Sequence, residues 1–246
     1  MTDLILLHGG QHGSWCWDPM VQMMDADGHP FARIIALDMP GCGRKRDCDP
    51  EGLSLADITR GLNDELRAAQ VSDAVLVGHS IAGVLLPMMA VEDPTLFSQL
   101  VYVATAGPAE GQTIMQMLGT SLQGTHPDEV GWPVDLATTS PEALSRAIFG
   151  RDLKEEQLAW LLAQVAQDKT PPATQFEPVS RSGYVELGMK ATYVLTLRDD
   201  IFSQAWQRRF AERLNCSDRV EIDTPHEPFV SHPHLLASTL IATAFP

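Results

Sequence analysis

Six short, largely apolar runs, separated by helical patterns, constrain the fold of this chain more than any other feature. Continuous rather than alternating hydrophobicity is typical of strands buried on both faces, as in a parallel sheet. The runs are Leu4–Leu7, Arg33–Leu37, Ala74–Val77, Leu100–Ala104, Thr192–Leu197 and Arg219–Ile222. Amphipathic stretches between and after them are expected to be helices, at Leu53–Ala69, Ser80–Glu92, Ser203–Asn215 and Pro233–Ala244. This alternation predicts an α/β fold of about six mostly parallel strands flanked by helices.

The stretch between the fourth and fifth expected strands breaks this rhythm. Helical patches replace strands there, at Thr113–Leu118, Pro141–Phe149 and Lys154–Ala166. We therefore expect one domain, with a core formed by residues 1–109 and 189–246 and a helical lid, residues 110–188, inserted after the fourth strand. The alternative is a plain helical excursion that gates nothing.

Charge narrows the classes of partner. The 246 residues carry a formal net charge of −15, and an acidic surface repels phosphate backbones and anionic headgroups. We therefore expect a small-molecule substrate rather than nucleic acid or a membrane, and the sequence leaves a homodimer open. The sequence has no apolar stretch of about 18 residues that would span a bilayer, and its N-terminus lacks the basic start of a signal peptide. We expect a cytoplasmic protein.

The four cysteines also suit that compartment. They have neither the CxxC spacing of a zinc site nor the pattern of a disulfide framework. Reduced thiols are expected, with a Cys42–Cys48 bridge as the alternative.

The strongest chemical signal is the segment AVLVGHSIAG, from Ala74 to Gly83. A buried strand runs into a tight turn and directly into an apolar helix, which is the context of a nucleophile elbow with Ser80 at its tip. Gly78 is the small neighbour that the close approach of strand and helix requires. The last position of the G-x-S-x-G pattern is Ala82 rather than glycine. The alternative is an ordinary turn in which Ser80 only caps the helix.

The segment LLHGGQHGSWCW after the first strand suits an oxyanion-binding loop. A serine nucleophile needs N–H donors aimed at the developing oxyanion, and glycines let a loop backbone approach the substrate. We assign the donors to the N–H groups of Gly10 and Ile81, the latter because it follows the nucleophile in the first turn of its helix. His8 and His12 are expected to hold the loop by hydrogen bonds.

His226, in the loop after the last strand, is the expected general base, because the base must lie at the carboxyl end of the sheet beside the elbow. His232 is its rival. Asp199, after the fifth strand, is expected to orient the imidazole, with Asp200 as the rival. The sequence contains no P-loop, no GxGxxG after a strand and no HExxH, so neither a metal nor an organic cofactor is expected.

Five further residues are candidates for the wall of a substrate pocket. Two adjoin the oxyanion and elbow motifs, and three are aromatic residues of the lid, for which simple packing is the alternative. They are Gly9, His79, Trp132, Phe149 and Trp160.

With these residues in place, the sequence resembles the α/β-hydrolase superfamily, and within it the branch of plant methylesterases, hydroxynitrile lyases and similar bacterial esterases. Four stretches carry the likeness: LILLHGGQHGSWCW, the turn Asp38–Gly43, VLVGHSIAG, and YVLTLRDDIF with the His226 loop. The resemblance spans both halves of the core, and the lid matches weakly. It implies an α/β-hydrolase fold.

The resemblance also distinguishes hydrolase from lyase. Lyases of this branch have threonine after the first histidine of the oxyanion loop and lysine after the catalytic histidine, where this chain has Gly9 and Glu227. A glutamate has the wrong charge to stabilise departing cyanide. We therefore expect a serine hydrolase that cleaves a carboxylic ester, or a related acyl bond, through an acyl-enzyme. The alternatives are a non-hydrolytic enzyme on the same fold, either a lyase or a cofactor-free oxygenase, and a ligand receptor built on a hydrolase scaffold.

Overall fold

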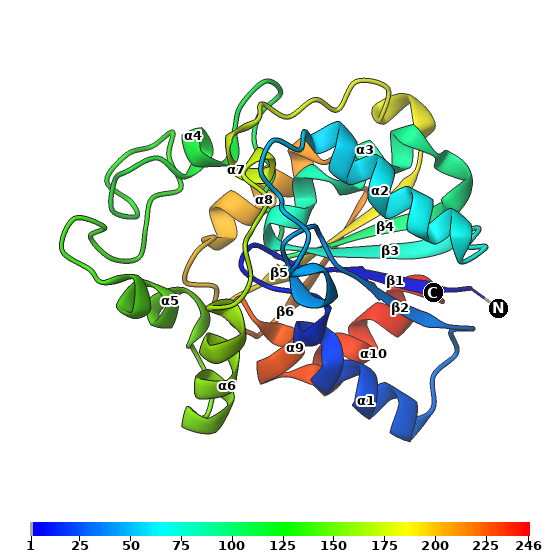
Figure 1. The fold of residues 1–246 in the computed structure, drawn as a ribbon, viewed down its shortest axis with the longest axis horizontal. Coiled ribbons are helices and arrows are strands. Elements are labelled where there is room, and N and C mark those ends of the chain that lie inside the picture. Colours follow the sequence, from blue (N-terminus) through cyan, green and yellow to red (C-terminus); the bar gives the residue numbers. More distant parts are fainter. Residues whose placement is uncertain (1) are drawn as a thin grey trace.

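A six-stranded sheet runs through the middle of the molecule (Figure 1). The computed structural model describes residues 2–246. Neighbouring strands are all parallel, in the order β2-β1-β3-β4-β5-β6. They are β1 (Leu4–Leu7), β2 (Ile34–Leu37), β3 (Ala74–His79), β4 (Phe97–Val103), β5 (Lys190–Thr196) and β6 (Asp218–Ile222). The predicted parallel sheet is confirmed, and each strand overlaps the apolar run that predicted it.

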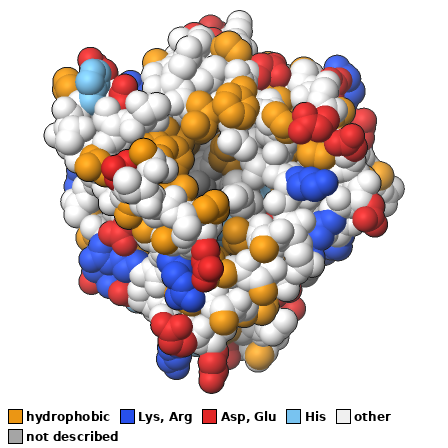
Figure 2. Space-filling view, turned by 60° about the vertical axis from the view of Figure 1, so that its left-hand side comes forward, with side chains coloured by type: hydrophobic (Ala, Val, Ile, Leu, Met, Phe, Trp, Pro, Cys, Tyr) orange, Lys and Arg blue, Asp and Glu red, His pale blue; other side chains and the backbone are white. Residues whose placement is uncertain are grey.

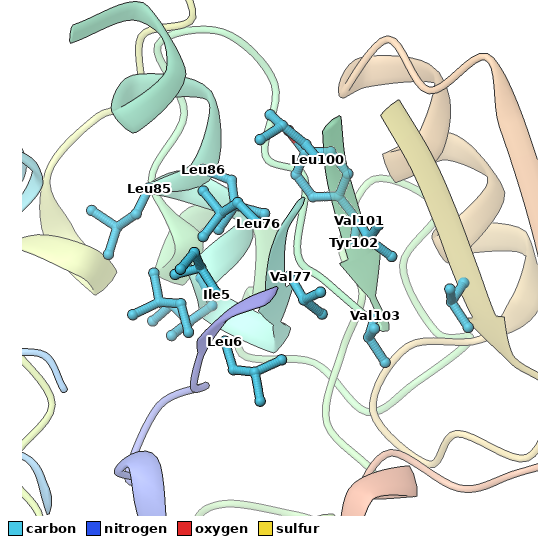
Figure 3. Close-up of a cluster of buried hydrophobic side chains, with 14 of the residues drawn as sticks. Ile5, Leu6, Leu76, Val77, Leu85, Leu86, Leu100, Val101, Tyr102 and Val103 are labelled. Carbon is cyan, nitrogen blue, oxygen red and sulfur yellow. The ribbon is translucent and has the colours of Figure 1, made fainter. Parts of the chain in front are cut away.

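The apolar side chains of the central strands explain why the sheet forms where it does. Every residue of β1 and β3 is buried, because helices cover both faces of the sheet. Figure 3 shows Ile5, Leu76 and Leu100 of three adjacent strands beside Leu85 and Leu86, which are the N-cap and the first residue of the helix after β3. Burial of such side chains stabilises the fold by roughly 25 cal/mol for each Å² of apolar surface removed from water.

The flanking helices form two layers (Figure 1). α1, α9 and α10 cover one face of the sheet, and α2 and α3 cover the other, while α8 packs against β5. Their bounds are α1 (Asp18–Asp27), α2 (Leu55–Ala68), α3 (Leu86–Glu92), α8 (Gln204–Arg213), α9 (Pro228–Ser231) and α10 (Pro233–Ala244).

The helix expected over Ser80–Glu92 differs from the prediction at its start. Ser80–Val84 forms a 3₁₀ turn, and α3 begins only at Leu86. Pro87 lies in the first turn of α3. Since proline has a fixed φ and no N–H to donate to the preceding turn, it favours the start of a regular helix over its continuation.

The chain between β4 and β5, residues 104–189, is called the inserted segment below. It contains α4 (Ile114–Leu118), α5 (Pro141–Phe149), α6 (Glu155–Val165) and α7 (Ala173–Phe176). Its only strand-like contact among the described residues is an isolated bridge between Leu122 and Trp132. In Figure 1, α4 lies at the upper left of the sheet, and α5 and α6 lie next to each other at the lower left. The domain bounds 110 and 188 and a gating motion of this segment stay predictions.

The structure bears on two expectations from the sequence, which concern membrane-spanning helices and the state of the cysteines. Within residues 2–246, no helix combines the length and the apolar character needed to cross a membrane. All four cysteines are free thiols. The expectation of reduced thiols therefore agrees with the structure, and the alternative of a Cys42–Cys48 bridge is wrong.

Candidate active site

Ser80 lies at the tip of a strained turn between β3 and α3. Its φ is 51°, in the left-handed region that residues other than glycine rarely adopt. A Cβ on Gly78 would lie 2.5 Å from Leu86 Cδ1 and 3.2 Å from the Ala82 Cβ. The turn closes because position 78 has no side chain, and that free space also accommodates the methyl group of Ala82. The departure from G-x-S-x-G is therefore structurally tolerated.

A chain of hydrogen bonds joins Ser80, His226 and Asp199. His226 Nε2 lies 3.1 Å from Ser80 Oγ, and its Nδ1 lies 2.7 Å from Asp199 Oδ2. The His226 and Asp199 side chains are buried. Because Nδ1–H donates to the carboxylate, Nε2 keeps its lone pair toward the serine hydroxyl. This geometry suits a nucleophile, a general base and an orienting acid.

Asp199 is itself fixed by the turn that carries it. Its Oδ1 accepts the backbone N–H groups of Ile201 at 2.8 Å and Phe202 at 2.9 Å, and its Oδ2 also accepts the Thr196 hydroxyl at 2.9 Å. Donors on both oxygens keep the carboxylate oriented toward the imidazole.

The rivals considered from the sequence have other partners. Asp200 pairs with Arg151, and His232 Nε2 lies 3.3 Å from the guanidinium of Arg198. Across residues 2–246, the hydrogen bonds to Ser80 Oγ and to its imidazole partner involve neither rival. The geometry thus favours Asp199 over Asp200 as the acid that orients His226. The sequence alone left Asp200 as an alternative.

Two opposing effects act on the base. Burial lowers the pKa of His226, but the negative charge and the hydrogen bond of Asp199 raise it, and the net pKa is raised above its ordinary value. The buried carboxylate of Glu227 adds to the increase. The surroundings therefore stabilise the imidazolium that forms when the histidine accepts a proton.

The predicted oxyanion donors lie on facing segments. Gly10 and Ile81 both line the same cavity as Ser80. A Cβ on Gly10 would lie 3.7 Å from Ile81 Cγ2. The Ile81 N–H belongs to the first turn after the nucleophile, where N–H groups have no partner within the helix. The oxyanion loop and the elbow therefore adjoin one another at the serine.

The cavity above Ser80 has a volume of about 420 Å³. Figure 2 shows the molecular surface hollowed there, with hydrophobic side chains around the opening. The inserted segment supplies most of the apolar wall, including Ile114, Met115, Leu118, Trp132, Ile148 and Phe149. Trp132 and Phe149 thus lie where the sequence analysis expected pocket residues.

A family comparison fits this geometry. Residues 4–239 match the model of the "Alpha/beta hydrolase family". The chain belongs to this family.

Individual relatives of the hydrolase are distant, and several of them cover nearly all of it. Methylesterase 9 of Arabidopsis thaliana is 26% identical over 257 residues, covering 99% of this chain and 98% of the relative. Norfluorocurarine synthase 1 of Strychnos nux-vomica is 26% identical over 252 residues, covering 96% of this chain and 92% of the relative. The solved structure of an extracellular alpha/beta-hydrolase from a Paenibacillus species has a TM-score of 0.78 at 17% identity, covering 99% of both chains. That structural likeness bears on the fold alone.

Three of the predicted pocket residues are misplaced, because within residues 2–246 none of them lines the cavity of this hydrolase. His79 is buried, and its Nε2 lies 2.9 Å from the backbone oxygen of His226. Gly9 packs against the His79 ring, since a Cβ on Gly9 would come 2.8 Å from His79 Nδ1. Trp160 packs edge-on against Trp15, with ring centroids 5.3 Å apart. All three support the site from outside its wall.

His8 holds the oxyanion loop of the hydrolase, in agreement with its expected structural role. Its Nε2 accepts the Met39 N–H at 3.0 Å, and its Nδ1 lies 2.7 Å from the Gly9 oxygen. A ring that accepts at one nitrogen and donates at the other is neutral. Burial favours that form and lowers the pKa of His8 to about 4.

A buried cluster of polar groups behind the base was not anticipated. Glu227 lies 3.4 Å from His12 Nε2, and both side chains are inaccessible to solvent. His79, Glu227 and His226 have potential metal-ligand atoms within 4.8 Å of one another. His226, however, already bonds at both ring nitrogens, so a metal there would displace the serine or the aspartate. A carboxylate directly after the base is the only signal in the sequence for this cluster.

Proposed function

We propose that this alpha/beta hydrolase is a serine carboxylesterase that cleaves small, uncharged esters through an acyl-enzyme. The observation that carries the proposal is the hydrogen-bonded chain Ser80–His226–Asp199 beneath an apolar cavity. The full-length similarity to a methylesterase supports an ester substrate. The alternatives of a lyase, an oxygenase or a ligand receptor rest on no feature of the described site.

In the proposed mechanism, Ser80 Oγ attacks the acyl carbon while His226 Nε2 accepts its proton. The imidazolium then protonates the leaving alcohol, and Asp199 keeps the ring oriented throughout. The N–H groups of Gly10 and Ile81 stabilise the oxyanion of the tetrahedral intermediate. Water, activated by the same histidine, hydrolyses the acyl-enzyme and releases the acid.

The cavity supports the substrate class. Its volume of about 420 Å³ lies within the usual range for small-molecule sites. Asp168 is the charged residue among those that line it, and its carboxylate is engaged by Trp15, Gly43 and Arg46. The wall thus offers apolar contact and no free cation among its described lining residues, which favours a neutral ester. A cytoplasmic location and the absence of nucleic-acid and membrane partners stay predictions, and a homodimer stays open.

The test combines covalent labelling with turnover. A fluorophosphonate should label the wild type, and p-nitrophenyl esters from acetate to octanoate should be hydrolysed with a chain-length optimum set by the cavity. Ser80→Ala should lose labelling and hydrolysis while keeping its melting temperature. The control Ser182→Ala, at an exposed serine, should keep labelling and hydrolysis. Equal turnover by wild type and Ser80→Ala would refute the proposal. A wild type that neither reacts nor turns over esters would favour the lyase, oxygenase and receptor alternatives.

A further inference from the structure

The peptide bond between Gly10 and Gln11 is held at both ends by side chains that the mechanism above does not use. The Gly10 carbonyl lies 2.7 Å from His12 Nδ1. The Gln11 N–H donates to Thr170 Oγ1 at 2.6 Å. Gln11 has a φ of 58°, so the turn adopts a conformation that a non-glycine residue holds only when its surroundings impose it.

We propose that His12 and Thr170 are positioning residues that fix the Gly10–Gln11 peptide and thereby aim the Gly10 N–H at the oxyanion. This inference rests on the proposed esterase function. The amide nitrogen and the carbonyl of Gly10 share one Cα, so holding the carbonyl limits the direction of the N–H. Glycine has no side chain to limit its backbone rotation, so this restraint must come from outside the residue.

His12 is equipped to act as a strong donor. Its Nε2 faces the Glu227 carboxylate at 3.4 Å, and neither group is exposed. Both ring nitrogens of His12 thus face oxygens. Burial lowers the pKa of His12, but the charge of Glu227 opposes this effect and the net pKa is raised, which favours the imidazolium. A cationic donor makes a stronger hydrogen bond to a carbonyl than a neutral one. Because Glu227 follows the base directly, it also ties the base loop to the oxyanion loop.

Thr170 belongs to the inserted segment, and its position is fixed by its neighbours. Asp168, whose side chain is buried, accepts hydrogen bonds from Trp15 Nε1 at 2.6 Å and from the Gly43 N–H at 3.0 Å. The Lys169 N–H donates to the Gly41 carbonyl at 2.8 Å. These bonds dock residues 168–170 onto the core. The segment that shapes the cavity therefore also supports the oxyanion loop.

Substitutions at Thr170 test the proposal. Thr170→Val removes the acceptor and keeps the shape, Thr170→Ser keeps the acceptor, and Thr138→Val is the matched control at an exposed threonine of the same segment. Steady-state hydrolysis of p-nitrophenyl butyrate gives kcat and KM, and inhibition by n-butylboronic acid, which forms a tetrahedral serine adduct, reports on the oxyanion site. Loss of a whole oxyanion donor costs about 100- to 1000-fold in kcat, so a misaligned donor should cost roughly tenfold.

The expected pattern for Thr170→Val is a fall in kcat and a matching loss of boronic-acid affinity at unchanged KM, with recovery in Thr170→Ser and no change in Thr138→Val. His12→Gln, confirmed as folded by thermal melting, should also lower kcat and boronic-acid affinity at unchanged KM. In the double variant, kcat should fall by a smaller factor than the product of the two single factors, because both residues act on one peptide. Unchanged boronic-acid affinity in Thr170→Val, or a loss that serine does not restore, would overturn the inference.

Fluorophosphonate labelling separates this inference from the function on which it rests. A wild type that takes up no label contradicts the esterase proposal, and this inference with it. A labelled, active wild type whose Thr170→Val variant retains full kcat contradicts only the role of Thr170.

Discussion

His226 has two buried carboxylates near it, and they have different roles. Asp199 bonds its ring at 2.7 Å, while Glu227 pairs with His12 instead. Both negative charges raise the pKa of His226 against the effect of burial. Burial raises the pKa of Glu227 itself, but the charge of His12 opposes this effect and the net pKa is lowered to about 2. The carboxylate therefore stays ionised at every pH at which the protein would work.

The pH dependence of activity follows from this environment. The base must be neutral to accept the serine proton, and its pKa is raised, so kcat/KM should fall toward acid with a midpoint above the ordinary histidine value of about 6.5. Asp199→Asn should move that midpoint to lower pH and reduce kcat by up to about 10⁴-fold, as loss of the orienting acid does in serine proteases. A pH profile of ester hydrolysis measures both. Asp200→Asn is the matched control, and a larger loss there than at position 199 would reverse the assignment of the acid.

The sequence predicted the serine, the acid and the base because each follows an apolar strand, and parallel strands end at the same edge of a sheet. It misplaced His79, which ends β3 with a buried side chain. The chain leaves the extended conformation at Ser80, where φ is 51°, so the serine faces the cavity while the residue before it stays in the core. The direction of the Glu227 side chain, away from the cavity and toward His12, depends on packing between loops that no local pattern encodes.

At the scale of elements, the elbow packs so closely against the chain after β4 that Gly83 has no room for a side chain. A Cβ on Gly83 would lie 2.2 Å from the Ala106 carbonyl oxygen and 2.9 Å from Thr105 Cβ. A backbone oxygen has no rotamer to adopt, so the turn carrying the nucleophile would have to shift. In α2, by contrast, a Cβ on Gly61 would find no described heavy atom within 4 Å outside the helix itself.

The same substitution should therefore have opposite effects at these two glycines. Gly83→Ala should destabilise the protein by about 1–3 kcal/mol through overpacking and reduce ester turnover. Gly61→Ala, in the interior of a helix, should stabilise it by about 0.5–1 kcal/mol and leave turnover unchanged. Urea denaturation midpoints give both values. A Gly83→Ala protein with wild-type stability and activity would mean that the elbow is less tightly constrained than described.

Three helices of the inserted segment, α4, α5 and α6, were predicted from the sequence, but neither α7 nor the arrangement of the cavity wall was. α5 spans Pro141–Phe149, as its pattern predicts, because Ser140 caps it and proline begins it. Which of its faces lines the cavity depends on tertiary packing that its own pattern does not encode, and the docking of the segment onto the core through Asp168 is equally non-local. That residue carries no recognisable motif. Trp160 was consequently assigned to the cavity although it packs on Trp15.

At the scale of the whole molecule, the net charge of −15 acts on any substrate that approaches the cavity. A negative field lowers the local concentration of anions, and salt screens it over about 10 Å at 0.1 M. The apolar wall reinforces this selection, because a carboxylate would lose its hydration there without gaining a cationic partner.

We therefore expect the p-nitrophenyl monoester of glutaric acid, which is anionic, to be hydrolysed with a kcat/KM at least about tenfold below that of the neutral p-nitrophenyl butyrate. Raising the salt concentration should narrow the difference without abolishing it, because the field is screened while the desolvation cost persists. Steady-state kinetics in low and high salt provide the measurement. An anionic ester that is hydrolysed as fast as the neutral one would show that a cation reaches the site.

The docking of residues 168–170 has a consequence for how such a protein can diversify. One uninterrupted stretch of chain forms most of the cavity wall, so mutations there can change which ester is accepted while the serine, the acid and the base stay untouched. Thr170 is the exception, because its hydroxyl also accepts a hydrogen bond from the peptide beside the oxyanion donor. Mutations along most of the stretch can thus change the substrate range without changing the catalytic rate. A mutation of Thr170 is expected to change both.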